Sequence, residues 1–306
     1  MTSRNPMEDR FSGIVTFIAV VEAGSFSGAA FHMNLTRSAV AKSIARLEQR
    51  LGLKLFHRTT RQQTLTHEGG LYYEHGLRML NDLNALESEL RDQQVGPEGK
   101  IRISCPALFG RRCVAPVIRS LTRTHPNIQI ETEFSDRVVD ILTEGFDVAI
   151  RIGSLTDSSV LIGKKIAEQR MGVFASPAYL KQFGVPVSVA DIQKHRGILY
   201  GRKTHTASWT IQDEQGAFID ISPASEEIYD DLQVIADSAV EGGGLAWLPT
   251  WHGKPYVEKG LLTSVMGSLN THPIEVHIVW LKNKYLPHRT RLLIDTLAQQ
   301  VPLLME

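Results

Sequence analysis

Apolar residues recur at helical spacing in three consecutive segments at the start of the chain, which cover residues 11–23, 25–34 and 36–51. In the first two segments they fall at positions i, i+3, i+4 and i+7, and in the third at intervals of four, three and four. Such spacing predicts amphipathic helices with one buried face. Ser25 and Thr36, whose hydroxyls suit helix N-caps, precede the second and third helices. A short helix, a tight turn and a longer helix in this order are typical of a helix-turn-helix.

The third predicted helix has an outer face of small and basic residues. Its apolar stripe is formed by Val40, Ile44, Leu47 and Leu51, which leaves the opposite side polar. Small side chains let a helix approach base edges closely, and Arg and Lys donate hydrogen bonds to guanine or to phosphate. The residues of this helix that we expect to contact DNA are Thr36, Arg37, Ser38, Ala41, Lys42 and Arg46.

Charge is divided unevenly between the start of the chain and the rest. Residues 1–66 contain nine Lys and Arg but four Asp and Glu, a net charge of +5, whereas the whole chain has 33 of each kind. The rest of the chain therefore carries −5. A helical hairpin followed by a coiled coil would explain the periodicity alone equally well. The charge asymmetry instead indicates a nucleic-acid-binding module joined to another domain.

Three stretches of this basic region resemble the winged helix-turn-helix of LysR-type transcriptional regulators. They read FIAVVEAGSFSGAA at 17–30, SAVAKSIARLE at 38–48 and LGLKLFHRTTR at 51–61, and the resemblance continues over nearly all 306 residues. In that family a wing follows the recognition helix, which implies short strands at 56–58 and 63–65. By the same resemblance, the wing residues expected near phosphates or the minor groove are Arg58, Thr59 and Arg61.

The start of the recognition helix departs from the usual pattern of the family. Many members carry Gln-Pro where this chain has Arg37-Ser38, and Ser where it has Ala41. Base preference cannot be transferred from those members, because Arg favours guanine where Gln favours adenine.

A long helical pattern follows the wing. It begins after Thr66, a suitable N-cap, ends near Gln93, and is broken by the Gly and Pro residues of 95–99. Apolar residues at alternating spacings of four and three predict a two-stranded coiled-coil seam with one weak position at Gly76. Packing on the chain's own body is the alternative, whereas the resemblance implies dimerisation. The predicted seam consists of Tyr72, Met79, Leu83, Leu86 and Leu90.

From Lys100 onward, strand-like runs alternate with helical ones, which predicts an α/β domain. Strands are expected at 101–105, 128–134, 147–152, 171–175, 198–200, 208–211, 245–248 and 274–280, and helical runs at 115–124, 138–144, 180–183, 231–241 and 289–300. The resemblance implies a two-lobed effector domain of the periplasmic-binding-protein-like type, after an all-α winged helix-turn-helix and a long linker helix. The implied boundaries are 1–66 for the DNA-binding domain, 67–98 for the linker helix and hinge, and 99–306 for the effector domain, with lobe I at 99–169 and 272–306 and lobe II at 170–271.

A candidate effector site lies at the carboxyl ends of the predicted strands. Ligands of open α/β sheets bind there because loop amides and helix N-termini converge, and similar positions line the inducer cleft in the resembling family. Their amides, hydroxyls and aromatic rings, with Arg151, suit a small carboxylate, including an aromatic one. Core packing is the alternative for each aromatic residue, and Arg151 could instead pair with Asp147 or a neighbouring acid. The expected effector-binding residues are Cys105, Pro106, Ala107, Leu108, Phe109, Phe134, Ser135, Asp136, Arg151, Ile152, Gly153, Tyr200, Gly201, His205 and Trp247.

Other chemistries find little support in the sequence. Cys105 and Cys113 are the only cysteines; peroxide-sensing members of the resembling family carry their reactive pair in the second lobe, so we expect two inert thiols. Two cysteines and no signal peptide indicate a reducing cytoplasm. The histidines lack metal-ligand spacing, the glycines at 242–244 are typical of a helix end, and no phosphate-binding or nucleophile-elbow motif occurs. We therefore expect no metal, no cofactor and, without a long apolar stretch, no membrane partner.

The sequence as a whole predicts a ligand-responsive transcription regulator of the cytoplasm and not an enzyme. We expect a homodimer or homotetramer to place recognition helices on an inverted repeat of double-stranded DNA, to bind a small effector between its lobes, and to meet RNA polymerase at the promoter. The alternative is a cytoplasmic α/β enzyme or binding protein that acts on a small acid and uses its N-terminal helices for oligomerisation.

Overall fold

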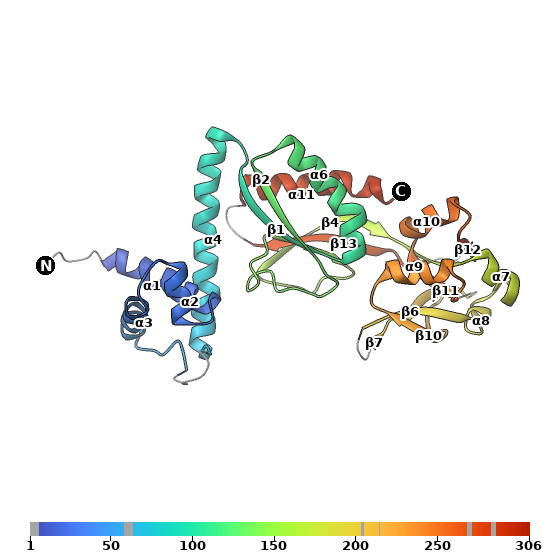
Figure 1. The fold of residues 1–306 in the computed structure, drawn as a ribbon, viewed down its shortest axis with the longest axis horizontal. Helices are drawn as coiled ribbons and strands as arrows, with labels where there is room; N and C mark the ends of the chain where they lie inside the picture. The colour runs from blue at the N-terminus through green and yellow to red at the C-terminus, as the bar shows by residue number, and fades with distance from the viewer. Residues whose placement is uncertain (1–5, 58–63, 203–204, 214, 268–270, 283–285) are drawn as a thin grey trace. The chain divides into compact units, whose positions relative to one another are not determined.

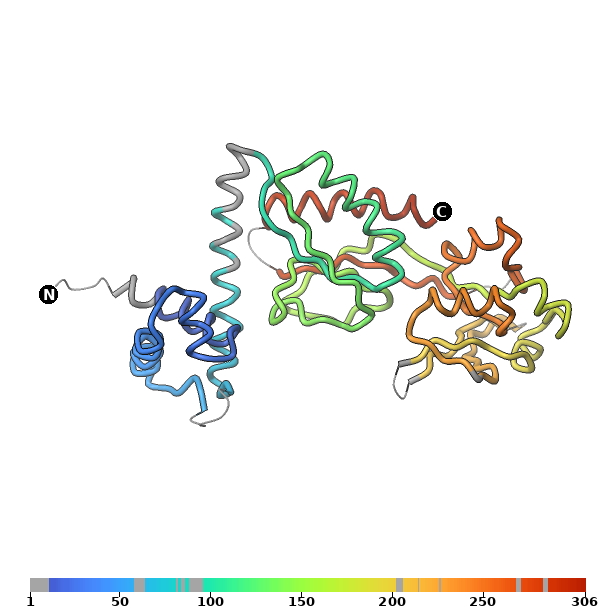
Figure 2. Tube along the Cα trace, viewed as in Figure 1, coloured from blue at the N-terminus to red at the C-terminus, as the bar shows by residue number. Residues whose placement is uncertain are grey.

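The chain folds into two compact units. One is formed by residues 1–94 with 283–287, and the other by 95–282 with 288–306. Figure 2 follows the chain from its N-terminal helices, in blue, to its C-terminal helix, in red. The computed structural model describes residues 6–57, 64–202, 205–213, 215–267, 271–282 and 286–306.

The first unit begins with the three predicted helices, α1 (Pro6–Glu22), α2 (Phe26–His32) and α3 (Arg37–Leu51). Ser25 caps α2, because its hydroxyl accepts a hydrogen bond from the amide of Gly28 at 3.0 Å. Thr36 caps α3 in the same way and accepts from the amide of Ala39 at 3.2 Å. Gly24 has a φ of +65°, which permits the tight reversal between α1 and α2. The predicted helix-turn-helix is confirmed.

The apolar faces of these helices meet in one core. Val40, Ile44 and Leu47 of α3 are buried, as the periodicity predicted. Phe17 of α1 is fully buried, and its ring centroid lies 5.3 Å from that of Phe56, which follows α3. Burying a side chain of this size stabilises a fold by about 1.5–3 kcal/mol. The core therefore holds the buried side of α3 and leaves its other side outward.

A long helix, α4 (His67–Val95), follows. Thr66 caps it, because its hydroxyl accepts a hydrogen bond from the amide of Gly69 at 2.9 Å. Tyr73 is buried in the core of the three N-terminal helices. Gly76 approaches α1 so closely that a Cβ atom there would lie 3.3 Å from Cγ2 of Ile14. The first half of α4 is therefore part of the same core.

The second unit contains two separate sheets, and the first has the order β2-β1-β3-β13-β4. β1 is parallel to β2 and β3, whereas β13 is antiparallel to β3 and β4. The helices α6 (Ala115–Thr124) and α11 (His288–Gln300) contact each other and this sheet (Figure 1). We call this part lobe I. Its strands are β1 (Gly99–Cys105), β2 (Ile128–Phe134), β3 (Val148–Ile152), β4 (Leu161–Gln169) and β13 (Ile274–Leu281).

The second sheet has the order β10-β6-β11-β5-β12 and forms lobe II. β6 is parallel to β10 and β11, and β5 is antiparallel to β11 and β12. Its strands are β5 (Met171–Ala175), β6 (Arg196–Arg202), β10 (Ala224–Tyr229), β11 (Leu245–Pro249) and β12 (Thr263–Val265). Smaller elements are β7 (His205–Thr206) and the hairpin of β8 (Trp209–Gln212) and β9 (Phe218–Ile221). Its helices are α7 (Pro177–Phe183), α8 (Val189–Ile192), α9 (Leu232–Val240) and α10 (Thr250–Glu258).

The chain passes between the two sheets twice, from β4 to β5 and from β12 to β13. The predicted α/β class with two lobes is confirmed. The predicted helical run at 138–144 is wrong, because this segment forms turns. Asp140 Oδ1 accepts hydrogen bonds from the amides of Leu142 and Thr143, which is the pattern of an N-cap, so a helix from residue 138 does not run through Asp140. The sequence also missed β4 and α10, both of which border the site described below.

None of the described helices is by itself long and apolar enough to cross a membrane. Within the described part of the chain, one pair of segments, Phe11–Glu22 and Phe26–His32, has the combined length and composition for this, and the two are bent by 115° to each other.

Candidate DNA-binding face and effector pocket

The outer face of α3 is exposed to solvent. It lies opposite the buried stripe of Val40, Ile44 and Leu47, and its hydrogen-bond donors are therefore available to a ligand. All the residues of this helix predicted to contact DNA are exposed, namely Thr36, Arg37, Ser38, Ala41, Lys42 and Arg46. The hydroxyl of Thr36 also lies 3.1 Å from that of Ser38.

The base of the wing lies where the sequence placed it. Phe56 and Leu65 form an antiparallel bridge, and the amide of His57 donates to the carbonyl of Thr64 at 2.9 Å. This pairing brings residues on either side of 58–63 together. The predicted wing contacts Arg58, Thr59 and Arg61 lie outside the described residues.

Glu48, which the sequence analysis did not single out, joins the last turn of α3 to the wing. Its carboxylate accepts a hydrogen bond from the buried amide of Leu55 at 2.9 Å and pairs with Lys54. Burial raises the pKa of Glu48, but the hydrogen bonds from Lys54 and Leu55 outweigh it, so that the pKa lies below its ordinary value of 4.5. An acid at the end of an otherwise basic helix was the available signal.

The predicted seam of α4 is divided between two environments. Tyr72 packs edge to face on Phe17, with 5.4 Å between the ring centroids, so its side chain follows the alternative of packing within the chain. Met79 and Leu83 are 37% and 41% exposed. Leu86 is partly exposed, and the side chain of Leu90 lies outside the described part of the helix.

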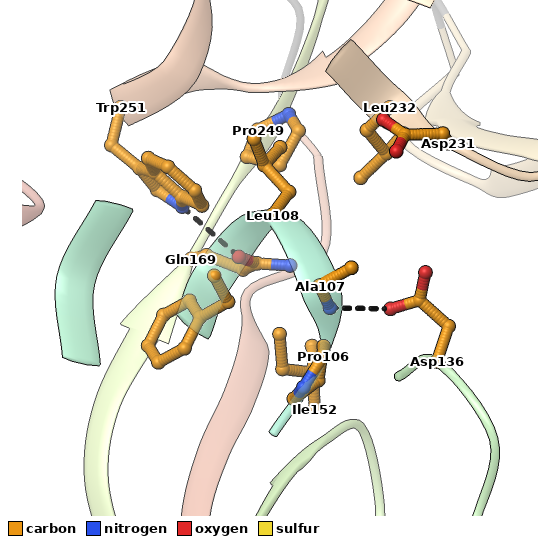
Figure 3. A pocket seen from close by; sticks show the side chains of 11 residues that line it. Pro106, Ala107, Leu108, Asp136, Ile152, Gln169, Asp231, Leu232, Pro249 and Trp251 are labelled. Carbon is orange, nitrogen blue, oxygen red and sulfur yellow. Dashed lines mark hydrogen bonds between the residues drawn. The ribbon is translucent and has the colours of Figure 1, made fainter. Parts of the chain in front are cut away.

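A pocket lies at the carboxyl end of β1, between lobe I and lobe II (Figure 3). The chain after β1 turns into a short helical segment, α5 (Ala107–Phe109), and then into a π-helical turn at Gly110–Val114. Such π turns occur often at functional sites. Lobe I contributes Pro106, Ala107, Leu108, Phe109, Asp136, Ile152 and Gln169 to the lining, and lobe II contributes Asp231, Leu232, Pro249 and Trp251. The cavity measures about 40 Å³, which is room for a few water molecules.

Two hydrogen bonds fix polar groups of the lining (Figure 3). Asp136 Oδ1 accepts from the amide of Ala107 at 3.0 Å, and Gln169 Oε1 accepts from Trp251 Nε1 at 3.0 Å. The rings of Phe109 and Trp251 meet edge to face at 5.9 Å. The hydrogen bond between Gln169 and Trp251 and the ring contact between Phe109 and Trp251 join the two lobes at the wall of the pocket.

Polar contacts also join the lobes at the rim of the pocket. Arg111 Nη1 of the π turn lies 3.8 Å from Asp231 Oδ2, and Arg112 Nη2 donates to Gln233 Oε1 at 3.3 Å. Asp231 caps α9 as well, since its Oδ1 accepts from the amide of Gln233 at 2.7 Å. Asp231 therefore takes part in the pocket lining, the helix cap and the contact between lobes.

Six of the predicted effector residues line this pocket: Pro106, Ala107, Leu108, Phe109, Asp136 and Ile152. Eight others do not: Cys105, Phe134, Ser135, Arg151, Gly153, Tyr200, Gly201 and Trp247. For His205 the structure describes the backbone only. The lining residues that the sequence analysis missed are Gln169, Asp231, Leu232, Pro249 and Trp251, although Asp231 before an apolar helical run was a recognisable N-cap.

Packing accounts for the positions of most predicted residues outside this pocket. Cys105 and Phe134 close over Gly110, where a Cβ atom would lie 2.6 Å and 2.4 Å from their side chains. Trp247 stacks on Trp209 in the lobe II core, at 5.7 Å and 9°, and Tyr200 packs against the other core cluster of that lobe. Arg151 donates to the carbonyl of Val139 and is not paired with Asp147.

The two cysteines do not form a disulfide and are both buried. Burial raises the pKa of the Cys105 and Cys113 thiols to about 12, so neither is a thiolate at neutral pH. This supports the prediction of inert thiols. Among the described residues, no group of three His, Cys, Asp or Glu side chains is placed to hold a metal ion.

Comparisons with known proteins cover both units of the chain. Residues 11–70 match the model of the bacterial regulatory helix-turn-helix protein, lysR family, and residues 94–302 match the LysR substrate binding domain. An HTH-type transcriptional regulator of Haemophilus influenzae is 32% identical over 282 residues, which are 91% of this chain and 96% of the relative.

Two solved structures are similar over nearly the whole chain. CrgA, a LysR-type transcriptional regulator from Neisseria meningitidis, has a TM-score of 0.62 at 26% identity and covers 95% of this chain and 98% of its own. The full-length Vibrio cholerae virulence activator AphB has a TM-score of 0.61 at 28% identity and covers 94% and 97%. These relatives are regulators, which removes the alternative of an enzyme. The chain belongs to the LysR family of DNA-binding transcriptional regulators and carries the effector-binding domain of that family.

Proposed function

We propose that the outer face of α3 reads the bases of an operator, with the wing on the adjacent backbone. The observation that carries this proposal is the exposure of Lys42 and Arg46 on the side of α3 opposite its buried stripe, with Arg37 exposed in the first turn. Arg37 would contact guanine, because its guanidinium can donate to two acceptors of that base. A gel shift with the DNA upstream of the chain's own gene tests the proposal. Binding that is insensitive to salt and equal on unrelated DNA would contradict it.

Dimerisation through the second half of α4 would supply two such heads for an inverted repeat. Met79 and Leu83 support this part, because two exposed apolar side chains four residues apart favour a helix-helix contact. Replacing both by Lys should convert the dimer to a monomer in analytical ultracentrifugation. Leu71→Lys is a matched control, since Leu71 is 47% exposed on the same helix but is not part of the seam. A dimer that survives the double replacement would contradict the assignment.

The effector would bind in the pocket between the lobes and change how the lobes meet. Support comes from the lining, to which both lobes contribute, and from the contacts of Arg111 and Arg112 at its rim. An effector can shift an equilibrium only by binding one lobe arrangement better than another. A thermal-shift screen of the full chain should find compounds whose effect is lost in Leu232→Phe, a variant that fills the pocket from lobe II. Compounds that act equally on this variant would place the effector elsewhere.

The residues that line the pocket do not favour the carboxylate ligand suggested by the sequence. Arg151, the cation on which it rested, donates to Val139 and is outside the lining. The lining residues that the structure describes include two Asp and neither Lys nor Arg.

A further inference from the structure

The polar groups of the pocket show a consistent chemical preference. At the end of β1, the amide of Ala107 would ordinarily attract an anion, as backbone amides at the start of a helix do. This position is occupied by the chain's own carboxylate, since Asp136 Oδ1 accepts from that amide at 3.0 Å. A carboxylate ligand would have to displace Asp136 or lie beside it.

The two acids of the lining have little cationic compensation. Asp136 has no ion-pair partner among the described residues. Asp231 has one, Arg111, at 3.8 Å, and the Arg111 side chain is 54% exposed. Exposed pairs of this length are weak. The pocket therefore presents two acids, at least one of them unpaired, to whatever enters it.

The side-chain amide of Gln169 is a third polar group of the pocket, in addition to the two acids. The N–H of Trp251 can only donate, so its 3.0 Å bond to Gln169 sets the orientation of the amide, with the oxygen toward Trp251. Figure 3 shows the amide nitrogen of Gln169 turned away from Trp251, toward the turn at Ala107. Gln169 is 7% exposed, and its nitrogen donates to none of the described residues. A donor on the pocket wall that has no partner within the protein favours a ligand that carries an acceptor.

We infer that the effector is a small cationic amine that also carries a hydroxyl or carbonyl oxygen. The inference rests on the proposed function of this pocket as the effector site. The ammonium lies between Asp136 and Asp231, and the oxygen accepts from the amide nitrogen of Gln169. The cavity of about 40 Å³ limits the ligand in this lobe arrangement to a few heavy atoms. The ammonium competes with Arg111 for Asp231, which couples the ligand to a contact between the lobes.

A matched set of probes tests the charge of the ligand. Ethanolamine, glycolate and ethylene glycol are similar in size and share a hydroxyl, but carry a positive charge, a negative charge and no charge. Each is added to the full chain up to about 100 mM at constant ionic strength and near neutral pH, and the melting temperature is followed. Ethanolamine alone should raise it. No shift with ethanolamine, or a larger shift with glycolate, would overturn the inference.

Two substitutions at the pocket should change ethanolamine binding in opposite directions. Asp136→Asn keeps an acceptor for Ala107 but removes the charge, and should weaken ethanolamine binding by about tenfold or more. Asp140→Asn is the matched control, because Asp140 is also an amide-capping acid of lobe I but lies outside the pocket, and binding should be unchanged. Arg111→Gln should strengthen ethanolamine binding several-fold, because it removes the competing cation, whereas a carboxylate ligand would be weakened.

The result separates this inference from the proposed function. If glycolate raises the melting temperature and Leu232→Phe abolishes that shift, the pocket remains the effector site and the cationic class is wrong. If ethanolamine acts equally on wild type, Asp136→Asn and Leu232→Phe, both the class and the site are wrong. Operator binding by Asp140→Asn, measured by gel shift without a probe compound, should equal that of wild type in either case, because Asp140 lies outside the pocket.

Discussion

The carboxylate of Glu48 offers a quantitative test of how α3 is held. Glu48 is 9% exposed and accepts from the amide of Leu55, a residue that is 1% exposed. In Glu48→Ala this buried amide loses its acceptor, which should destabilise the head by about 1–3 kcal/mol. Glu48→Gln keeps an oxygen for Leu55 and loses only the charge opposite Lys54. Because Lys54 is 56% exposed, that ion pair should be worth about 0–1 kcal/mol.

The expected order of destabilisation is therefore Glu48→Ala first, with Glu48→Gln and Lys54→Ala close to each other and well below it. Hydrogen exchange of the α3 amides in the full chain measures these differences within the head, without interference from the second unit. The sign with pH follows from the lowered pKa of Glu48. The advantage of wild type over Glu48→Gln should be present above pH 4.5, the ordinary value, and should fade as the pH falls through the lower pKa of the folded protein.

Two outcomes would refute this reasoning. Equal destabilisation by Glu48→Gln and Glu48→Ala would mean that charge, and not the bond to Leu55, is the main contribution. A Glu48→Ala variant within about 0.5 kcal/mol of wild type would mean that the buried amide finds another acceptor.

Three further variants test other parts of the structure. Thr36→Ala removes the cap of α3 and should cost the head about 1 kcal/mol in hydrogen exchange, whereas Thr36→Ser should be nearly neutral; equal effects of the two would contradict the cap. His252 is 3% exposed, and burial lowers its pKa from 6.5 to about 4. Between these pH values the folded state binds fewer protons than the unfolded one, so the free energy of unfolding should fall by up to about 3 kcal/mol as the pH falls from 6.5 to 4. In His252→Leu the melting temperature should depend less on pH over that interval. An unchanged dependence on pH would contradict this role of His252. Trp251→Phe leaves Gln169 Oε1 without its donor and should destabilise the second unit by about 1–3 kcal/mol in urea, so unchanged unfolding would show that this bond contributes nothing.

The head was predictable from sequence because its determinants are local. Caps such as Ser25 and Thr36 act within three residues, and the stripe of Val40, Ile44 and Leu47 repeats at the period of the helix that it buries. In α4 the spacing of apolar residues did not show whether the chain's own core or a partner helix covers the apolar face. Tyr72 meets the chain's own Phe17, whereas Met79 and Leu83 remain exposed.

The missed parts of the site depend on residues far apart in the sequence. β4 is an edge strand, and its Gly163, Lys164 and Lys165 are exposed, so it lacks the apolar run that marks inner strands. Gln169 at its end and Trp251 meet across 82 positions of sequence. Gly110 lets the ring of Phe134 lie directly against the π turn, where a Cβ atom would be 2.4 Å from it, so this strand-end residue packs on the chain and does not line the pocket. The segment after β1 from Pro106 to Phe109, together with Asp136 and Ile152 at the ends of β2 and β3, followed from the general rule for α/β sheets.

The central claim is that α3 places its basic face on DNA, and the salt dependence of operator affinity tests it most directly. In Lys42→Ala the slope of log affinity against log salt should become shallower by about 1 per head, or about 2 for a dimer, with weaker binding at every salt concentration. Arg119→Ala is the control, because Arg119 is also exposed but lies on α6 of the other unit, and both slope and affinity should stay at the wild-type values. A Lys42→Ala variant with wild-type affinity and wild-type slope would contradict the assignment of this face.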